Sequence, residues 1–121
     1  MPVIDLSGPD VSELARMLLR EIDGAYDVRV AALESTYPAI RRLDAFDDDS
    51  FDLVLMFTWN TDPLTYVDAQ AMTDRPILTV NPAEHAALRR YRDAGLSPRG
   101  PKCLQVIDRL RRAIDALEFA A

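Results

Sequence analysis

The amino-acid sequence predicts an α/β protein, a doubly wound parallel sheet with helices on both faces. Short apolar runs alternate with amphipathic helical segments along the chain, and this order favours strands joined by crossover helices. The run FDLVLMF at residues 51–57 is apolar throughout, as is typical of a central strand covered on both sides. The chain of 121 residues has no low-complexity linker, so we expect one domain over 1–121 with three layers and four or five strands.

The first strand and helix follow from a change of hydrophobic period. Val3 to Leu6 is a short apolar run that stops at a Ser-Gly-Pro turn, which predicts a buried strand. Apolar residues then recur at helical spacing from Val11 to Ile22, with Asp10 or Ser12 as the expected cap.

The middle of the chain repeats the alternation. Residues 26–33 predict a second strand, and residues 38–46 predict a weaker helix. The apolar run at 51–57 predicts the third strand, and an acidic stretch before it predicts a solvated connection. Asp62 and Pro63 then suit the N-cap and first position of a short helix.

The C-terminal part contains the fourth strand and two helices. Residues 76–80 predict the strand, and Asn81 with Glu84 predicts a capping box for the next helix. The segment GLSPRGP at 95–101 contains two prolines, so a fifth strand there is expected to be short, irregular or absent. One apolar stripe from Cys103 to Leu117 predicts the last helix.

Charge and composition exclude several classes of function. Lys plus Arg total 14 against 20 for Asp plus Glu, a formal net charge of −6, so we expect no direct nucleic-acid or membrane binding by this chain. One cysteine and one histidine exclude a disulfide, a cysteine-based zinc site and an imidazole cluster. No signal peptide or membrane-length apolar run is evident. We expect a cytoplasmic protein without metal or cofactor.

The order of elements resembles the receiver domain of bacterial response regulators over nearly the whole chain. The matching segments are VIDLSGPDVSELARMLLREI, YDVRVAALESTYPAIRRL, FDLVLMF, RPILTVNPAEHAALRRYRDAG, which carries the Ala94-Gly95 pair, and QVIDRLRRAIDAL. The resemblance implies a flavodoxin-like fold of strand order 2-1-3-4-5 and signalling within a two-component system.

The departures from the receiver pattern define a degenerate phosphorylation pocket. The acidic pair of the family falls on Leu6 and Ser7, the phospho-acceptor aspartate on Phe57, and the switch hydroxyl on Asn81. The lysine of the family falls within residues 99–102, which include Lys102. Because Mg²⁺ and phosphoryl transfer need oxygen ligands and a carboxylate nucleophile, we expect a pseudo-receiver that is not phosphorylated and has no catalytic residue.

Two further features stay open at the carboxyl edge of the predicted sheet. A neutral ligand pocket would use Ser7, Trp59, Asn60 and Asn81, although a closed loop region is the more ordinary interpretation. His85, in the first turn of its helix, is expected to be exposed.

The last two helices carry the expected output surface. In receivers the corresponding face forms the dimer, and here mixed charges could pair across a two-fold axis, with apolar contact from a few larger residues. We therefore expect phosphorylation-independent self-association or partner binding through this face. Its residues are Glu84, Leu88, Arg89, Tyr91, Arg92, Val106, Asp108, Arg109 and Arg112.

An enzyme remains as the alternative. The LSGP opening slightly resembles nucleoside deoxyribosyltransferases, which are small Rossmann-like proteins that act on nucleosides. The resemblance implies a carboxylate nucleophile on the helix after the third strand, where Asp68 is the acidic residue at hand, but the glycine-bearing motif of that family is absent.

Overall fold

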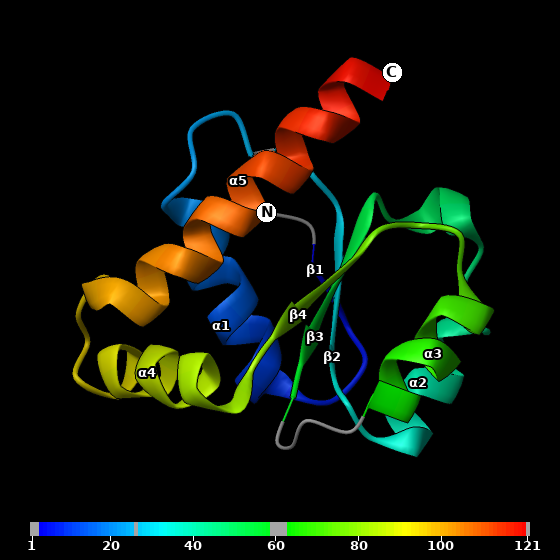
Figure 1. Cartoon of the computed structure of the whole chain (residues 1–121), viewed down its shortest axis with the longest axis horizontal. Coiled ribbons are helices and arrows are strands. Elements are labelled where there is room, and N and C mark those ends of the chain that lie inside the picture. The colour runs from blue at the N-terminus through cyan, green and yellow to red at the C-terminus, as the bar shows by residue number, and fades with distance from the viewer. Residues whose placement is uncertain (1–2, 26, 59–62, 121) are drawn as a thin grey trace.

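A computed structural model of the chain describes residues 3–25, 27–58 and 63–120. It contains a four-stranded, all-parallel sheet between two layers of helices, which confirms the predicted three-layer, flavodoxin-like class of α/β fold (Figure 1). The strands are β1 (Val3–Asp5), β2 (Val30–Glu34), β3 (Leu53–Phe57) and β4 (Ile77–Val80). The helices are α1 (Pro9–Arg20), α2 (Tyr37–Leu43), α3 (Pro63–Met72), α4 (Pro82–Asp93) and α5 (Gly100–Ala120), with a 3₁₀ turn at Asp48–Ser50.

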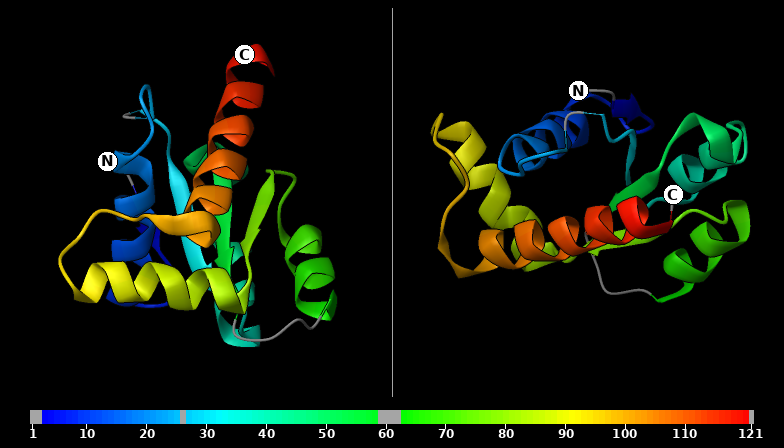
Figure 2. Two further views of the ribbon diagram at one scale, coloured as in Figure 1. Left: turned by 60° about the vertical axis from the view of Figure 1, so that its left-hand side comes forward. Right: turned by 90° about the horizontal axis from the view of Figure 1, so that it is seen from above.

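The two faces of the sheet are covered by different helices (Figure 2). Alternate strand residues point to opposite faces, so Val30 and Leu55 pack with α1, α4 and α5, whereas Ala31 and Met56 pack with α2 and α3. All five residues of β3 are fully buried, as the uninterrupted apolar run at 51–57 predicts.

The strand order is β1-β2-β3-β4, which differs from the 2-1-3-4-5 order that the resemblance to receivers implies. Strand β2, not β1, lies next to β3. Among the described residues, β1 is a three-residue edge strand that pairs only with β2. The steps β1→β2 and β2→β3 run in the same direction across the sheet, yet α1 and α2 lie on opposite faces. These two crossovers therefore have opposite hands, although parallel crossovers are right-handed in about 98% of cases.

Helix ends show which local predictions are correct. Asn81 caps α4 in a full capping box with Glu84, as predicted. The N-cap of α1 is Gly8, followed by Pro9, not Asp10 or Ser12. The expected cap Asp62 lies outside the described residues.

The segment after α4 contains no strand between its described residues 94 and 99, as its prolines predict. Gly95 adopts φ +69° and ends α4 in a Schellman arrangement: its N–H donates to the Arg92 carbonyl at 3.0 Å, and the N–H of Leu96 donates to the Tyr91 carbonyl at 2.9 Å. The chain then leads directly into α5, so β4 forms the second edge of the sheet.

Candidate functional site

The carboxyl ends of the strands, where α/β folds of this kind usually bind ligands, are closed by structural contacts at the β1 side. Leu6 is buried, its N–H donates to Ala32 at 3.1 Å, and its carbonyl accepts from the Arg42 guanidinium at 2.6 Å. Ser7 Oγ accepts from the Glu34 N–H at 2.8 Å. Both residues thus join the end of β1 to the helix layer and to β2.

The sequence predicts Leu6, Ser7 and Phe57 within one degenerate phosphorylation pocket, but the strand order separates them. Phe57 ends β3, whereas Leu6 follows β1, and β2 lies between these strands. With neighbouring strands about 4.8 Å apart, the ends of β1 and β3 are separated by about 10 Å. The side chains that would replace the acidic pair and the acceptor therefore do not share one pocket.

Phe57 fills the end of β3 with an aromatic ring that has no exposed surface. Its ring lies 5.3 Å from that of His85, centroid to centroid, at an interplanar angle of 59°. His85 itself is 1% exposed, so the expectation of an exposed histidine is wrong. The first turn of α4 faces the end of β3, and His85 occupies the space above Phe57.

This buried position changes the pKa of His85. Burial lowers the pKa of His85, and Arg89 lowers it further. The backbone of Thr58 and the charges of Asp10 and Glu34 act in the opposite direction without offsetting the burial. The folded protein therefore favours the neutral imidazole.

Asn81 and Lys102, the other two residues of the predicted degenerate pocket, have different roles. Asn81 Oδ1 accepts from the Glu84 N–H at 2.8 Å, and Glu84 Oε1 accepts from the Asn81 N–H at 3.1 Å. Lys102 is exposed on α5, and its charge contributes to lowering the pKa of Glu84. Both residues support the junction of α4 and α5.

The predicted neutral ligand pocket is not assembled by the described residues. Ser7 follows β1 and Asn81 follows β4, the two opposite edges of the sheet. Their side-chain oxygens accept hydrogen bonds from Glu34 and Glu84 backbone groups. The other two members, Trp59 and Asn60, lie outside the described residues.

The predicted output surface on α4 and α5 needs correction, because its apolar members are buried. Leu88 and Val106 have no exposed surface and belong to the core that α4 and α5 share with the sheet. They cannot supply the apolar contact expected of an interface. Tyr91 and Arg89 are only partly buried.

The charges of that surface are also paired within the chain. Arg109 binds Glu84, which is 1% exposed, through two short hydrogen bonds. Further ion pairs join Arg92 to Asp10 and Glu13 of α1 and to the adjacent Asp93, and Arg112 to Asp108 on the same helix. Arg109 and Arg92 therefore bind carboxylates of their own chain, whereas the Arg112–Asp108 pair is exposed at the surface.

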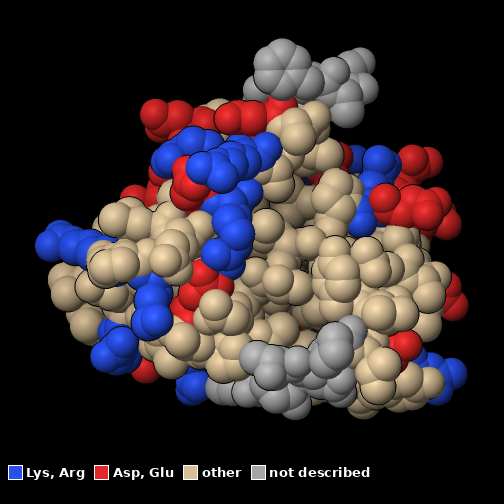
Figure 3. All heavy atoms as spheres, viewed as in Figure 1, with Lys and Arg blue, Asp and Glu red and all other residues tan. Residues whose placement is uncertain are grey.

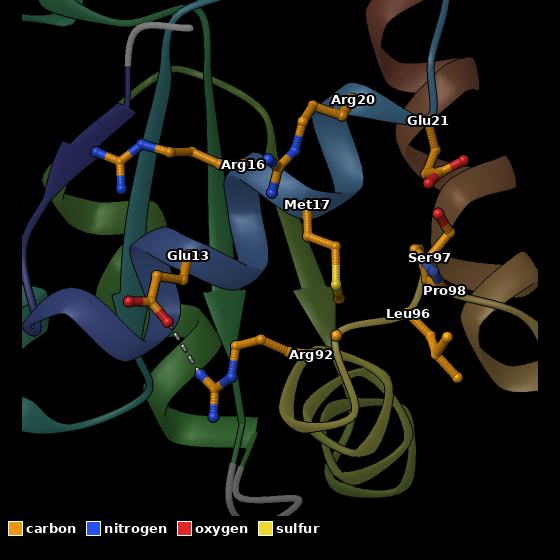
Figure 4. Close-up of a pocket in the computed structure, with 10 residues that line it drawn as sticks. Glu13, Arg16, Met17, Arg20, Glu21, Arg92, Leu96, Ser97 and Pro98 are labelled. Atoms are coloured by element: carbon orange, nitrogen blue, oxygen red, sulfur yellow. Dashed lines mark ion pairs between the residues drawn. The ribbon is translucent and has the colours of Figure 1, made fainter.

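A surface groove of about 520 Å³ lies away from the carboxyl edge, between α1 and the segment that follows α4 (Figure 4). Arg16 and Arg20 of α1 and Glu21, which follows it, line one side, and Leu96 and Pro98 line the other. Its walls mix both signs of charge with a few apolar groups. No sequence pattern predicts a groove there, because its two sides are far apart along the chain. Among the residues that the structure describes, no group of three or more His, Cys, Asp or Glu side chains could hold a metal ion.

The fold thus defines a three-layer α/β/α domain. The described part of its carboxyl edge holds the buried side chains of Leu6 and Phe57 and hydrogen bonds from backbone N–H groups to the side chains of Ser7 and Asn81. Comparison with known proteins adds no identity: no family model, no curated protein and no solved structure matches this chain. Within the described part of the chain, no helix is long and apolar enough to cross a bilayer.

Proposed function

We propose that this chain is a regulatory interaction domain of receiver-like design that signals by binding a protein and does not accept a phosphoryl group. The observation that carries the proposal is Phe57, a fully buried aromatic residue packed against His85, at the position to which the resemblance to receivers assigns the acceptor aspartate. A benzyl side chain offers neither a nucleophile nor a ligand for Mg²⁺.

Three polar side chains near the described part of the carboxyl edge support the same proposal. Ser7 and Asn81 use their side-chain oxygens to hold backbone N–H groups, and Glu84 uses its carboxylate to hold Arg109. Side chains committed in this way stabilise one conformation of the edge, whereas a phosphorylation switch requires two. The strand order differs from that of receivers. The likeness to receivers therefore rests on the order of strands and helices along the chain, and the proposal concerns how the domain acts.

The decisive experiment exposes the protein to acetyl phosphate and Mg²⁺ and measures its intact mass, beside a receiver domain that keeps its acceptor aspartate. We expect the control to gain a phosphoryl group and this chain to gain none, and we expect its sedimentation to be the same with and without the phosphodonor. A stable acyl phosphate on this chain would contradict the proposal.

The alternative of a nucleoside-transferring enzyme depends on Asp68. This residue is partly buried on α3, and the same helix exposes Leu64 and Val67 to solvent. A product assay with a nucleoside donor and a free base tests the alternative directly, with Asp68→Asn as the variant that should lose any activity found.

A further inference from the structure

Strand β4 is an edge of the sheet whose outer side has no strand beside it in the described structure. Its inner side is bonded to β3: the Val54 N–H donates to the Pro76 carbonyl at 2.9 Å, and the Thr58 N–H donates to the Val80 carbonyl at 2.9 Å. Since alternate residues of a strand direct their backbone groups to opposite edges, Ile77 and Thr79 direct theirs outward. An edge of this kind is a template for a further strand.

One side chain covers part of that edge. Arg109 Nη2 donates to the Thr79 carbonyl at 3.1 Å, while the same guanidinium holds Glu84. Within the described residues, no hydrogen bond reaches the N–H of Ile77, the N–H of Thr79 or the carbonyl of Ile77 from outside the sheet. Arg109 therefore occupies one of the four outward groups and leaves three accessible to a partner.

The surface beside the edge is apolar. Figures 1 and 2 show β4 at the front edge of the sheet, between α5 on one side and α3 on the other. On α3, Leu64, Tyr66 and Val67 are 66%, 36% and 56% exposed, and Asp68 is the one charged residue of residues 63–72. The space-filling view of the same side shows a broad area without charged side chains over α3 and the sheet edge (Figure 3).

We propose that this edge docks β4 of a second copy of this chain in an antiparallel pair, with Arg109 as a displaceable cover of the Thr79 carbonyl. The proposal rests on the proposed function as an interaction domain and names its partner. It also replaces the α4–α5 face as the interface, since the groups of that face are buried or paired.

Self-pairing is favoured because the outward groups are self-complementary. In an antiparallel pair, two opposite residues exchange both of their N–H···O bonds. With the two-fold axis at Leu78, Ile77 of one copy lies opposite Thr79 of the other, and the same pair repeats on the far side of the axis. All four outward groups of each strand then have partners, and the pairing extends a four-stranded sheet to eight strands.

Area and charge agree with a second copy as the occupant. Pairing of a four-residue strand alone would bury much less surface than the roughly 1,200 Å² that specific interfaces bury. A two-fold axis perpendicular to the sheet also brings α3 against α3 of the other copy, which would cover the exposed Leu64 and Val67. Two chains of net charge −6 repel each other over most approaches. This side carries few charges, with Arg109 at the edge and Asp68 as the one charged residue of α3, so it brings fewer carboxylates together than other approaches.

Concentration-dependent sedimentation combined with amide hydrogen exchange tests the proposal. We expect a monomer–dimer equilibrium in which the amides of Ile77 and Thr79 become protected as the protein concentration rises. The amides of Leu78 and Val80, which face β3, should be protected at every concentration and serve as the internal reference.

Two variants act on the edge alone. Thr79→Pro removes an outward N–H without removing a bond to β3, and Thr79→Lys places a charge at the edge, as natural edge strands do. Each should weaken dimerisation about tenfold or more. The proline loses a backbone hydrogen bond twice, once on each side of the axis, and the lysine keeps its backbone groups but brings a positive charge against the other copy. Ser97→Lys, at an exposed position that lines the groove beside α1, adds the same charge away from the edge and should dimerise like the wild type.

Three results would overturn the proposal. They are a wild type that remains monomeric at high concentration, a dimer in which the amides of Ile77 and Thr79 exchange freely, and a dimer that Thr79→Lys leaves unchanged although the variant is folded. The second and third results leave the proposed function standing through another surface. A phosphoryl adduct would overturn the proposed function independently of all three.

Discussion

Glu84 and Arg109 form a two-pronged ion pair, with oxygen-to-nitrogen distances of 2.6 and 2.7 Å, that joins the first turn of α4 to α5. The same carboxylate accepts from the Asn81 N–H, and the same guanidinium donates to the Thr79 carbonyl. The end of β4, the N-terminus of α4 and α5 are therefore held by one network. Such a network is stable only while every member is satisfied.

The first prediction is that Glu84→Gln destabilises the protein by about 3 kcal/mol, the lower end of the range for breaking a buried ion pair. The lower end applies because the Arg109 side chain is 37% exposed while that of Glu84 is 2% exposed. Denaturant unfolding of both proteins measures the difference. Asp108→Asn, which breaks the exposed pair with Arg112, is the control and should cost no more than about 0.5 kcal/mol; an equal loss in both variants would refute the assignment.

The acid dependence of stability follows from the same carboxylate. Burial raises the pKa of Glu84, but the hydrogen bonds of Arg109 and Asn81 and the charges of Arg109 and Lys102 lower it more, so the net pKa lies below its ordinary range. A carboxyl with a lowered folded pKa stabilises the protein above its unfolded pKa of about 4.3, and this stabilisation is lost as the pH falls through the folded value. Unfolding free energies from pH 6 to pH 3 should therefore decline less steeply for Glu84→Gln than for the wild type.

The second prediction concerns His85, whose pKa is lowered chiefly by burial. The unfolded chain takes up a proton near the ordinary histidine value of about 6.5, whereas the folded chain does so only at lower pH. Stability is therefore fully present above that value and declines as the pH falls from it toward the folded pKa.

Unfolding at pH 7.5 and pH 5.5 measures this decline, with His85→Gln as the comparison. The variant is expected to show a smaller change between the two pH values, because it carries no titrating group there, whatever its absolute stability. The neighbouring charges Asp10, Glu34 and Arg89 are present in both proteins. Identical slopes in both proteins would show that His85 does not titrate differently on folding.

The sequence predicts the local elements well because their causes are local. The apolar run at β3, the capping box of Asn81 and the loss of a fifth strand to Pro98 and Pro101 each depend on a few adjacent residues. Strand order has no such local cause. Nothing within residues 3–6 indicates that β1 pairs with β2 alone, so the order implied by the receiver resemblance could not be checked from sequence.

The predictions about the site residues were wrong for a related reason. The sequence of α4 does not determine whether His85 or its neighbours face the sheet. In the structure His85 is buried and its ring packs against Phe57 at the end of β3. Likewise, Glu84 and Arg109 are 25 residues apart in sequence. From sequence alone, a charged residue in a capping box is expected to be exposed to solvent. Its burial can be predicted only when the helix that packs against it is known.

The third prediction is that Phe57 cannot be converted back into a phospho-acceptor. Phe57→Asp places a carboxylate where the wild-type side chain is fully buried, which costs the packing of a large aromatic group, about 3–5 kcal/mol for removal to Ala, as well as desolvation of the charge. The end of β1 also lies beyond β2, so no carboxylate pair would stand beside the new one.

Phe57→Ala and Phe57→Asp, compared by thermal unfolding and by intact mass after acetyl phosphate treatment, measure both effects. We expect Phe57→Asp to be the less stable variant and neither to gain a phosphoryl group. Phosphorylation of a folded Phe57→Asp protein would show that the edge retains a working phosphoryl site.

The fourth prediction uses the single cysteine. Cys103 lies in the first turns of α5, is fully buried and packs in the core beneath that helix. Burial raises the pKa of the Cys103 thiol, and the charge of Glu84 raises it further. The backbone of Arg99 and the charge of Arg90 lower this pKa, but by less. Because the thiolate is the reactive form, the native thiol should react with a disulfide reagent far more slowly than the thiol of the chain unfolded in urea.

The rate of this reaction should also depend on how often α5 opens. Glu84→Gln, which loosens the junction of α4 with α5, is therefore expected to accelerate labelling of Cys103, whereas Asp108→Asn is not. Fast labelling of the native wild type would show that the N-terminal part of α5 is open in solution and would remove the basis for treating the α4–α5 junction as closed.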